Sequence, residues 1–136
     1  MSGSVDYLDT SALVKLIRQE EAWGSDLLAH LAAAGGPLVS SVLARAELLR
    51  VAFENPDEVA QAERIVEDLE LVAMTTAILD RAGRLSPASL RSLDAIHTAT
   101  ALSLGSDLHA LVAYDDRMIQ AARAMGLPVL SPGRAP

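Results

Sequence analysis

The segment VDYLDTSALVKLI, residues 5–17, decides the fold of this chain. Its first four residues, 5–8, are mainly apolar and begin with a β-branched valine, which is typical of a short buried strand. After Asp9 the apolar residues return at helical spacing, and Thr10 or Ser11 is suited to cap the helix. We therefore expect a strand that ends at Asp9 and leads directly into a helix, which is the elementary step of an α/β fold.

The same alternation of short apolar runs and longer amphipathic stretches continues along the chain. Further strands are predicted at 38–40, 71–74, 108–114 and 128–130, and further helices at 20–34, 41–53, 56–69, 76–85, 93–104 and 115–125. Helices between consecutive strands are what parallel connections require. The sequence thus predicts one α/β domain over residues 1–136, with a mainly parallel central sheet of four to five strands flanked by helices.

The amino-acid composition excludes several classes of protein. The chain has 136 residues, no cysteine, and 18 acidic against 11 basic residues, which gives a net charge of -7. This charge argues against a protein held to nucleic acid or anionic lipid by bulk positive charge. The lack of cysteine excludes disulfides, thiolate catalysis and iron–sulfur clusters. Residues 1–10 do not resemble an export signal and no apolar stretch is long enough for a bilayer, so we expect a cytoplasmic protein without a membrane partner.

Four carboxylates stand out by their positions. Asp9 and Asp115 follow predicted strands, where side chains project into the crevice at the carboxyl edge of a parallel sheet. Glu47 and Asp94 lie in predicted helices, each flanked by leucine and alanine at the spacing of a core face. A charge on a buried face is costly unless it is paired or bound to a metal. We expect all four carboxylates to converge at one end of the sheet.

Each carboxylate also has a purely structural interpretation. The three aspartates lie where helix caps or partners of the helix dipole are expected, and Asp116 suits the same role. Glu47 would be satisfied by an ion pair with Arg50 or Arg91. Four carboxylates gathered together, however, would repel and raise one another's pKa values. A divalent cation would relieve that repulsion.

The type of ligand indicates the type of ion. Carboxylate oxygens, without cysteine or a histidine cluster, favour a hard cation such as Mg²⁺ or Mn²⁺ over zinc. Such an ion orients a phosphodiester and lowers the pKa of a bound water. The pattern therefore indicates phosphoryl chemistry.

Four segments resemble the PIN-domain nucleases, and most closely the VapC-type toxins of bacterial toxin–antitoxin pairs. They are YLDTSALVKL at 7–16, SSVLARAEL at 40–48, RSLDAIHTATA at 91–101, and YDDRM through GLPV at 114–129. The segments follow the family's order and spacing across about 120 residues, so the resemblance covers most of the chain.

The resemblance implies a Mg²⁺- or Mn²⁺-dependent endoribonuclease, the toxin of a type II toxin–antitoxin system, that cleaves RNA such as tRNA or ribosomal RNA and inhibits translation. It also implies a homodimer that a VapB-type antitoxin neutralises in a heterotetramer or larger assembly. The apolar fraction of 51% agrees with such buried interfaces.

The acidic residues of the family are carried over position by position. Asp9, Glu47, Asp94 and Asp115 fall on its catalytic quartet. Our hypothesis is that the three aspartates bind the metal, while Glu47 holds or deprotonates the attacking water.

Neighbouring residues are predicted to support the quartet. Thr10 or Ser11 falls on the family's supporting hydroxyl, and Asp116 is an alternative to Asp115 as the fourth acid. Ala113 stands where the family commonly has threonine, which removes one hydroxyl from this end of the site.

The main alternative is a catalytically weak PIN-fold interaction protein that binds a partner through its apolar surface. His97, three residues after Asp94, is interpreted as a packed and hydrogen-bonded histidine. The aromatic residues are too few and scattered to predict a base-stacking platform, so RNA recognition is expected to rest on shape and phosphate contacts.

Overall fold

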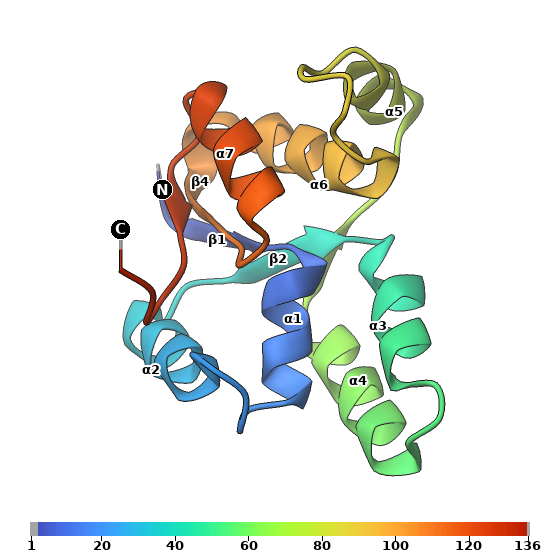
Figure 1. Ribbon diagram of the computed structural model, residues 1–136, viewed down its shortest axis with the longest axis vertical. Coiled ribbons are helices and arrows are strands. Elements are labelled where there is room, and N and C mark those ends of the chain that lie inside the picture. Colours follow the sequence, from blue (N-terminus) through green and yellow to red (C-terminus); the bar gives the residue numbers. More distant parts are fainter. Residues whose placement is uncertain (1–2, 136) are drawn as a thin grey trace.

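Five parallel strands form a central sheet with helices on both of its faces (Figure 1). The computed structural model describes residues 3–135. The strands are β1 (Val5–Leu8), β2 (Leu38–Ser41), β3 (Glu70–Val72), β4 (Leu108–Val112) and β5 (Val129–Leu130). The helices are α1 (Thr10–Ile17), α2 (Gly24–Ala34), α3 (Ala44–Ala52), α4 (Pro56–Asp68), α5 (Thr76–Gly83), α6 (Ser92–Ser103) and α7 (Asp116–Ala124), with a 3₁₀ turn at Gly105–Asp107. The predicted α/β class and parallel sheet are confirmed.

The order of the strands reverses beside β1. The sheet runs β3-β2-β1-β4-β5, so the chain builds outward from β1 on one side and then crosses to begin again at β4 on the other. Tyr7 of β1 lies opposite Leu111 of β4, and the two strands end next to each other. In open parallel sheets, ligands bind at the carboxyl ends of strands where the strand order reverses. In this chain that point lies between the ends of β1 and β4.

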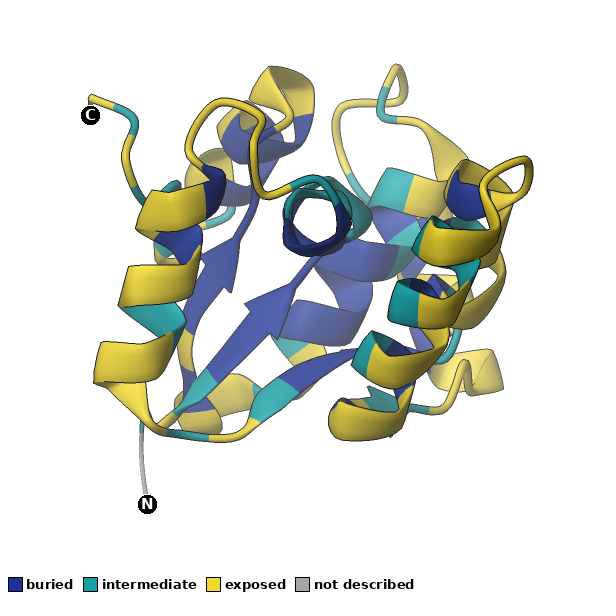
Figure 2. Ribbon diagram, turned by 90° about the horizontal axis from the view of Figure 1, so that it is seen from below, coloured by how far each residue is buried: buried dark blue, intermediate teal, exposed yellow. Residues whose placement is uncertain are grey.

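Consecutive residues of β1 pack into the two halves of the core. Leu8 lies in a cluster with Leu13 of α1 and Leu48 of α3, whereas Tyr7 lies in a second cluster with Met118 of α7. All of these side chains are fully buried. This is the alternation expected of a strand covered on both faces, and Figure 2 shows the buried sheet between helices whose outer surfaces are exposed.

Two helix starts differ from the prediction, and local backbone chemistry explains both. The helix predicted from residue 20 begins at Gly24, because Trp23 has a left-handed backbone with φ of 67° that does not continue a helix. The helix predicted over 41–53 begins later because Ser41 ends β2, and its hydroxyl accepts the N–H of Leu43 at 3.1 Å. The other predicted elements agree with the structure to within two residues at either end.

None of the helices in residues 3–135 is long and apolar enough to cross a membrane.

Candidate active site

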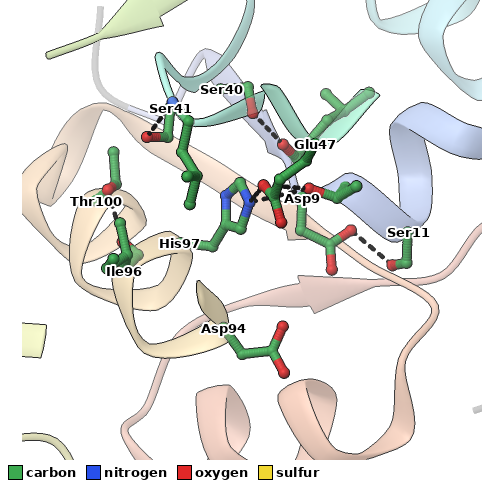
Figure 3. Close-up of polar contacts among 12 residues, drawn as sticks. Asp9, Ser11, Ser40, Ser41, Glu47, Asp94, Ile96, His97 and Thr100 are labelled. Carbon is green, nitrogen blue, oxygen red and sulfur yellow. Dashed lines mark hydrogen bonds and ion pairs between the residues drawn. The ribbon is translucent and has the colours of Figure 1, made fainter. Parts of the chain in front are cut away.

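The four predicted carboxylates come from four separate elements that meet near the carboxyl edge of the sheet. Asp9 follows β1, Asp115 precedes α7, Glu47 lies in the first turn of α3, and Asp94 lies in the first turn of α6. Figure 3 shows three of them, Asp9, Glu47 and Asp94, around the ring of His97.

Their charges act on one another. The pKa of Asp94 is raised above its usual value, first by partial burial and then by the charges of Asp115 and, more weakly, Glu47. The charge of Asp94 in turn contributes to raising the pKa of Asp9. Such mutual effects require carboxylates that lie near one another. The structure thus supports the predicted convergence through these electrostatic contacts.

Asp9 is buried and anchored through one of its two oxygens. Oδ1 accepts the hydroxyl proton of Ser11 at 2.7 Å and the N–H of Ala12 at 3.0 Å, so the side chain caps α1. No hydrogen bond from residues 3–135 reaches Oδ2. Burial outweighs these two hydrogen bonds and raises the pKa of Asp9 from 3.8 to about 6. Asp9 can therefore cap α1 with Oδ1 while Oδ2 remains available to a ligand.

Glu47 is held by a hydroxyl and an imidazole. Its Oε1 accepts the hydroxyl proton of Thr10 at 2.6 Å and lies 2.6 Å from Nε2 of His97 (Figure 3). The Nδ1 of His97 lies 2.7 Å from the hydroxyl of Tyr7. The partner of Glu47 is thus His97, whereas the arginine partners considered from the sequence, Arg50 and Arg91, form no salt bridge in the described part of the chain.

The supporting residues divide their roles. Thr10 contacts Glu47, and Ser11 links Asp9 to the chain beyond β4, because its oxygen also accepts the N–H of Tyr114 at 2.9 Å. Both hydroxyls named as alternatives from the sequence therefore contact the candidate site.

The two acids at the end of β4 have different surroundings. Oδ1 of Asp115 accepts the backbone N–H groups of Arg117 and Met118 at 3.0 and 3.1 Å, so it caps α7. Asp116 is 74% exposed and forms an ion pair with Arg134 at 2.8 Å. Only the charge of Asp115 is among the main influences on Asp94. Of the two acids, Asp115 thus interacts with Asp94, whereas Asp116 is engaged with Arg134 at the surface.

The donor set fits Mg²⁺ better than a metal enclosed by protein ligands. Within residues 3–135, no three histidine or carboxylate side chains are arranged to hold one ion together. Mg²⁺ is typically held by one or two carboxylates, with waters and substrate phosphates completing its shell. Asp9 and Asp94 both have a raised pKa, and the charge of Asp94 contributes to that of Asp9, so these are the two carboxylates that could share such an open site.

Several contacts were not predictable from the sequence. Tyr7 bonds to His97 from 90 positions away. Trp23 and Tyr114 stack with ring centroids 5.7 Å apart and planes at 6°, so two aromatic residues that look scattered in the sequence are neighbours. Lys15 contacts both rings, with Nζ at 5.1 Å from the centroid of Trp23 and 4.8 Å from that of Tyr114.

Two other histidines lie outside the site. His30 and His109 contact the buried carboxylate of Asp6 at 3.1 and 2.8 Å. They join α2 and β4 to β1 and share no hydrogen bond with the four carboxylates.

Fold and site together define a class: a parallel α/β domain with its carboxylates collected where the strand order reverses. The family model described as the PIN domain matches residues 7–124. The chain belongs to the PIN domain family.

Relatives from bacteria confirm the resemblance to VapC-type proteins. Ribonuclease VapC46 of Mycobacterium tuberculosis is 45% identical over 128 residues, covering 93% of this chain and 96% of the relative. Ribonuclease VapC47 of the same species is 36% identical over 132 residues, with the same coverage of 93% and 96%.

Solved structures agree with the fold at lower identity. The VapBC2 structure from Rickettsia felis, bound to a promoter DNA fragment, has a TM-score of 0.70 at 16% identity and covers 93% of this chain and 97% of that one. M. tuberculosis VapC20, described as a Sarcin-Ricin loop cleaving toxin, has a TM-score of 0.70 at 19% identity and covers 93% and 99%.

Proposed function

We propose that this chain is the ribonuclease toxin of a VapBC-type toxin–antitoxin pair and that it hydrolyses RNA phosphodiester bonds with Mg²⁺ or Mn²⁺. The observation that carries the proposal is the group of interacting carboxylates at the reversal point of a PIN-domain sheet. Relatives named as VapC ribonucleases, aligned along nearly the whole chain, support the same activity.

The metal-binding roles fall to three aspartates. Asp9 and Asp94 would hold the ion, and Asp115 would complete or bridge its shell, because these carboxylates interact electrostatically and Asp9 and Asp94 have oxygens without a hydrogen bond from residues 3–135. When bound, the ion supplies positive charge that orients the phosphodiester and makes a water more acidic.

The residues of the chain divide the remaining work. Ser11 and the N–H of Ala12 fix Asp9 by its Oδ1 atom, so that Oδ2 is left for the ion. Glu47 orients the attacking water and accepts its proton, while Thr10 holds the carboxylate in place. Attack in line with the leaving oxygen would give a 5′-phosphate and a 3′-hydroxyl.

The same proposal extends to partners and location. We infer a homodimer, neutralised by a VapB-type antitoxin in a heterotetramer or larger complex, with residues 1–136 acting as one domain. The complex from R. felis is named for both components, VapB and VapC. A toxin that cleaves tRNA or ribosomal RNA acts where translation takes place, which would be the cytoplasm.

One observation favours a second candidate, a catalytically weak PIN-fold interaction protein. Two of the four acids, Asp9 and Asp115, use one oxygen each to cap a helix, and no group of three ligands is assembled within residues 3–135. Metal binding separates the two candidates, because an active site requires it and a docking surface does not.

The test uses the purified chain, freed of antitoxin, with end-labelled total RNA. We expect cleavage with Mg²⁺ or Mn²⁺, none with excess chelator, and loss of at least about 10²-fold in rate for Asp9→Asn and for Asp94→Asn. Asp80→Asn, an exposed carboxylate on α5, is the matched control and should cleave as the wild type does. Retained cleavage in both site variants, or in chelator, would overturn the proposal.

A further inference from the structure

A chain of buried hydrogen bonds runs from β1 through α6 to the carboxylate of Glu47. The hydroxyl of Tyr7 lies 2.7 Å from Nδ1 of His97, and Nε2 of the same ring lies 2.6 Å from Oε1 of Glu47. The side chain of His97 is 1% exposed and that of Glu47 is 16% exposed. Figure 3 shows the ring of His97 directed at Glu47, with Asp9 beyond Glu47 on the same side of the ring and Asp94 below it.

The contacts of Thr10 show which atom donates in the hydrogen bond between His97 and Glu47. Its hydroxyl has one proton, which it donates to Oε1 of Glu47 at 2.6 Å. The same oxygen of Thr10 also lies 3.0 Å from Nε2 of His97, and toward that atom it has only a lone pair left to offer. Nε2 must therefore carry the hydrogen in this contact, and it donates both to Thr10 and to Glu47.

The other ring nitrogen, Nδ1, lies 2.7 Å from the hydroxyl of Tyr7. We infer that Nδ1 accepts the proton of this hydroxyl, so that the hydrogen of the ring is on Nε2 alone. Burial raises the pKa of Tyr7 above its usual value, so this hydroxyl keeps its proton. The contact with Tyr7 thus complements the ring form that donates to Glu47 and holds the ring in place at Nδ1.

Both donors converge on one oxygen of Glu47. Oε1 receives Thr10 and His97, whereas no hydrogen bond from the described residues reaches Oε2. Two donors at one oxygen remove the freedom of the carboxylate to rotate. Oε2 is consequently the oxygen left for a water or a proton.

We propose that Tyr7 and His97 are positioning residues that hold Glu47 by Oε1 and so present Oε2 to the attacking water. This inference rests on the proposed function and deepens it, because it assigns the two oxygens of Glu47 different tasks. It also explains why a histidine occupies the buried face of α6. An apolar residue there would fill the same space but leave Oε1 with Thr10 alone.

The first test needs no variant. The ring nitrogens of His97 in the wild-type protein are examined by nitrogen NMR near neutral pH, where we expect a proton on Nε2 and none on Nδ1. Tyr7→Phe removes the donor at Nδ1 only, so the Nδ1 signal should shift while the proton stays on Nε2, which Glu47 and Thr10 still require. A wild-type ring with a proton on Nδ1, or without one on Nε2, would overturn the proposal.

The second test compares two amide replacements of His97. The nitrogen of glutamine can reach the position of Nε2, whereas that of asparagine reaches only the position of Nδ1. We expect His97→Asn to lower kcat by about 10²-fold, the cost typical of a misplaced reacting group. His97→Gln should recover about 10-fold of that loss. KM and the stabilisation by Mg²⁺ should stay as in the wild type for both.

The matched control is Ser103→Ala, which removes a hydrogen bond at the far end of α6 and should leave kcat unchanged. Equal kcat in the asparagine and glutamine variants would overturn the proposal, as would a loss confined to KM. If the asparagine variant does not fold, the NMR result and Tyr7→Phe decide. The NMR measurement does not depend on cleavage, so an inactive wild-type protein would refute the proposed function and leave the hydrogen-bond chain to be judged separately.

Discussion

Replacing Asp9 with asparagine should stabilise the metal-free protein, although we expect the same change to lower cleavage at least about 10²-fold. The new amide would keep the cap of α1, because its oxygen accepts from Ser11 and from the N–H of Ala12 as a carboxylate oxygen does. The variant thus removes a buried charge with little loss of hydrogen bonding. Asp9 is 3% exposed, so solvent does not screen that charge.

The magnitude follows from the pKa of Asp9, which rises from 3.8 to about 6 on folding. Since the folded protein binds this proton more tightly than the unfolded chain, stability falls as pH rises from 3.8 to about 6 and is lowest above that range. At ~1.4 kcal/mol per pH unit, the full penalty above pH 6 is about 3 kcal/mol. Between pH 5 and pH 8 the wild type should lose about 1.4 kcal/mol through this group.

Thermal unfolding of both proteins at the two pH values measures the effect. For a chain of 136 residues, about 4 °C per kcal/mol is expected, so the wild-type Tm should fall by about 6 °C from pH 5 to pH 8 because of this group. The part of the pH dependence due to Asp9 should vanish in Asp9→Asn, which should melt above the wild type at pH 8. The comparison of the two proteins removes the contribution of carboxylates distant from Asp9, whereas the contribution of Asp94 changes together with that of Asp9, because their charges interact.

Bound Mg²⁺ should reverse the order of the two melting temperatures. Mg²⁺ that binds only the folded state stabilises the wild type in proportion to its saturation, and the variant should gain little. Equal pH dependence in wild type and variant would refute the argument from burial. An equal gain in Tm with Mg²⁺ would refute the assignment of Asp9 as a ligand.

Three further tests address the neighbouring residues. Asp115→Asn should lower cleavage at least about 10²-fold, whereas Asp116→Asn should leave it within about 3-fold, because of these two acids only Asp115 is among the main influences on Asp94; similar rates of labelled RNA cleavage in both variants would contradict this. Ser11→Ala leaves the N–H of Tyr114 without its acceptor and should cost about 1–3 kcal/mol in denaturant unfolding; an unchanged midpoint would show that this hydrogen bond is dispensable. Glu47→Gln should lower kcat by about 10²–10⁴-fold while the stabilisation by Mg²⁺ in a thermal melt persists, and loss of that stabilisation would make Glu47 a metal ligand instead.

The sequence predicted where the acidic residues lie in the fold better than it predicted their hydrogen-bond partners. Asp9 and Asp115 could be placed at strand ends because alternation and helical spacing are local patterns that the backbone follows directly. The partner of Glu47 could not be found in this way, since His97 lies 50 positions away and an arginine nearer in sequence looks equally suitable. Which side chain reaches Glu47 depends on how α3 and α6 pack against the sheet, and periodicity carries no information about that.

The same limit explains the missed aromatic pair. Trp23 lies in the turn before α2 and Tyr114 lies after β4, so neither belongs to a regular pattern. Their stacking depends on the left-handed backbone at Trp23, and a left-handed residue other than glycine is rarely foreseen from sequence.

The stack of Trp23 on Tyr114 provides an intrinsic fluorescence probe near the candidate site. Trp23 is the chain's single tryptophan, so all of the indole fluorescence of the protein comes from one ring. The ring rests on Tyr114, whose N–H bonds to Ser11 and through it to Asp9, and Asp115 is the next residue of the chain. A change at these carboxylates is therefore only a few bonds from the emitting group. The emission of Trp23 should therefore report binding at these carboxylates in real time, in the unmodified protein and without an added dye.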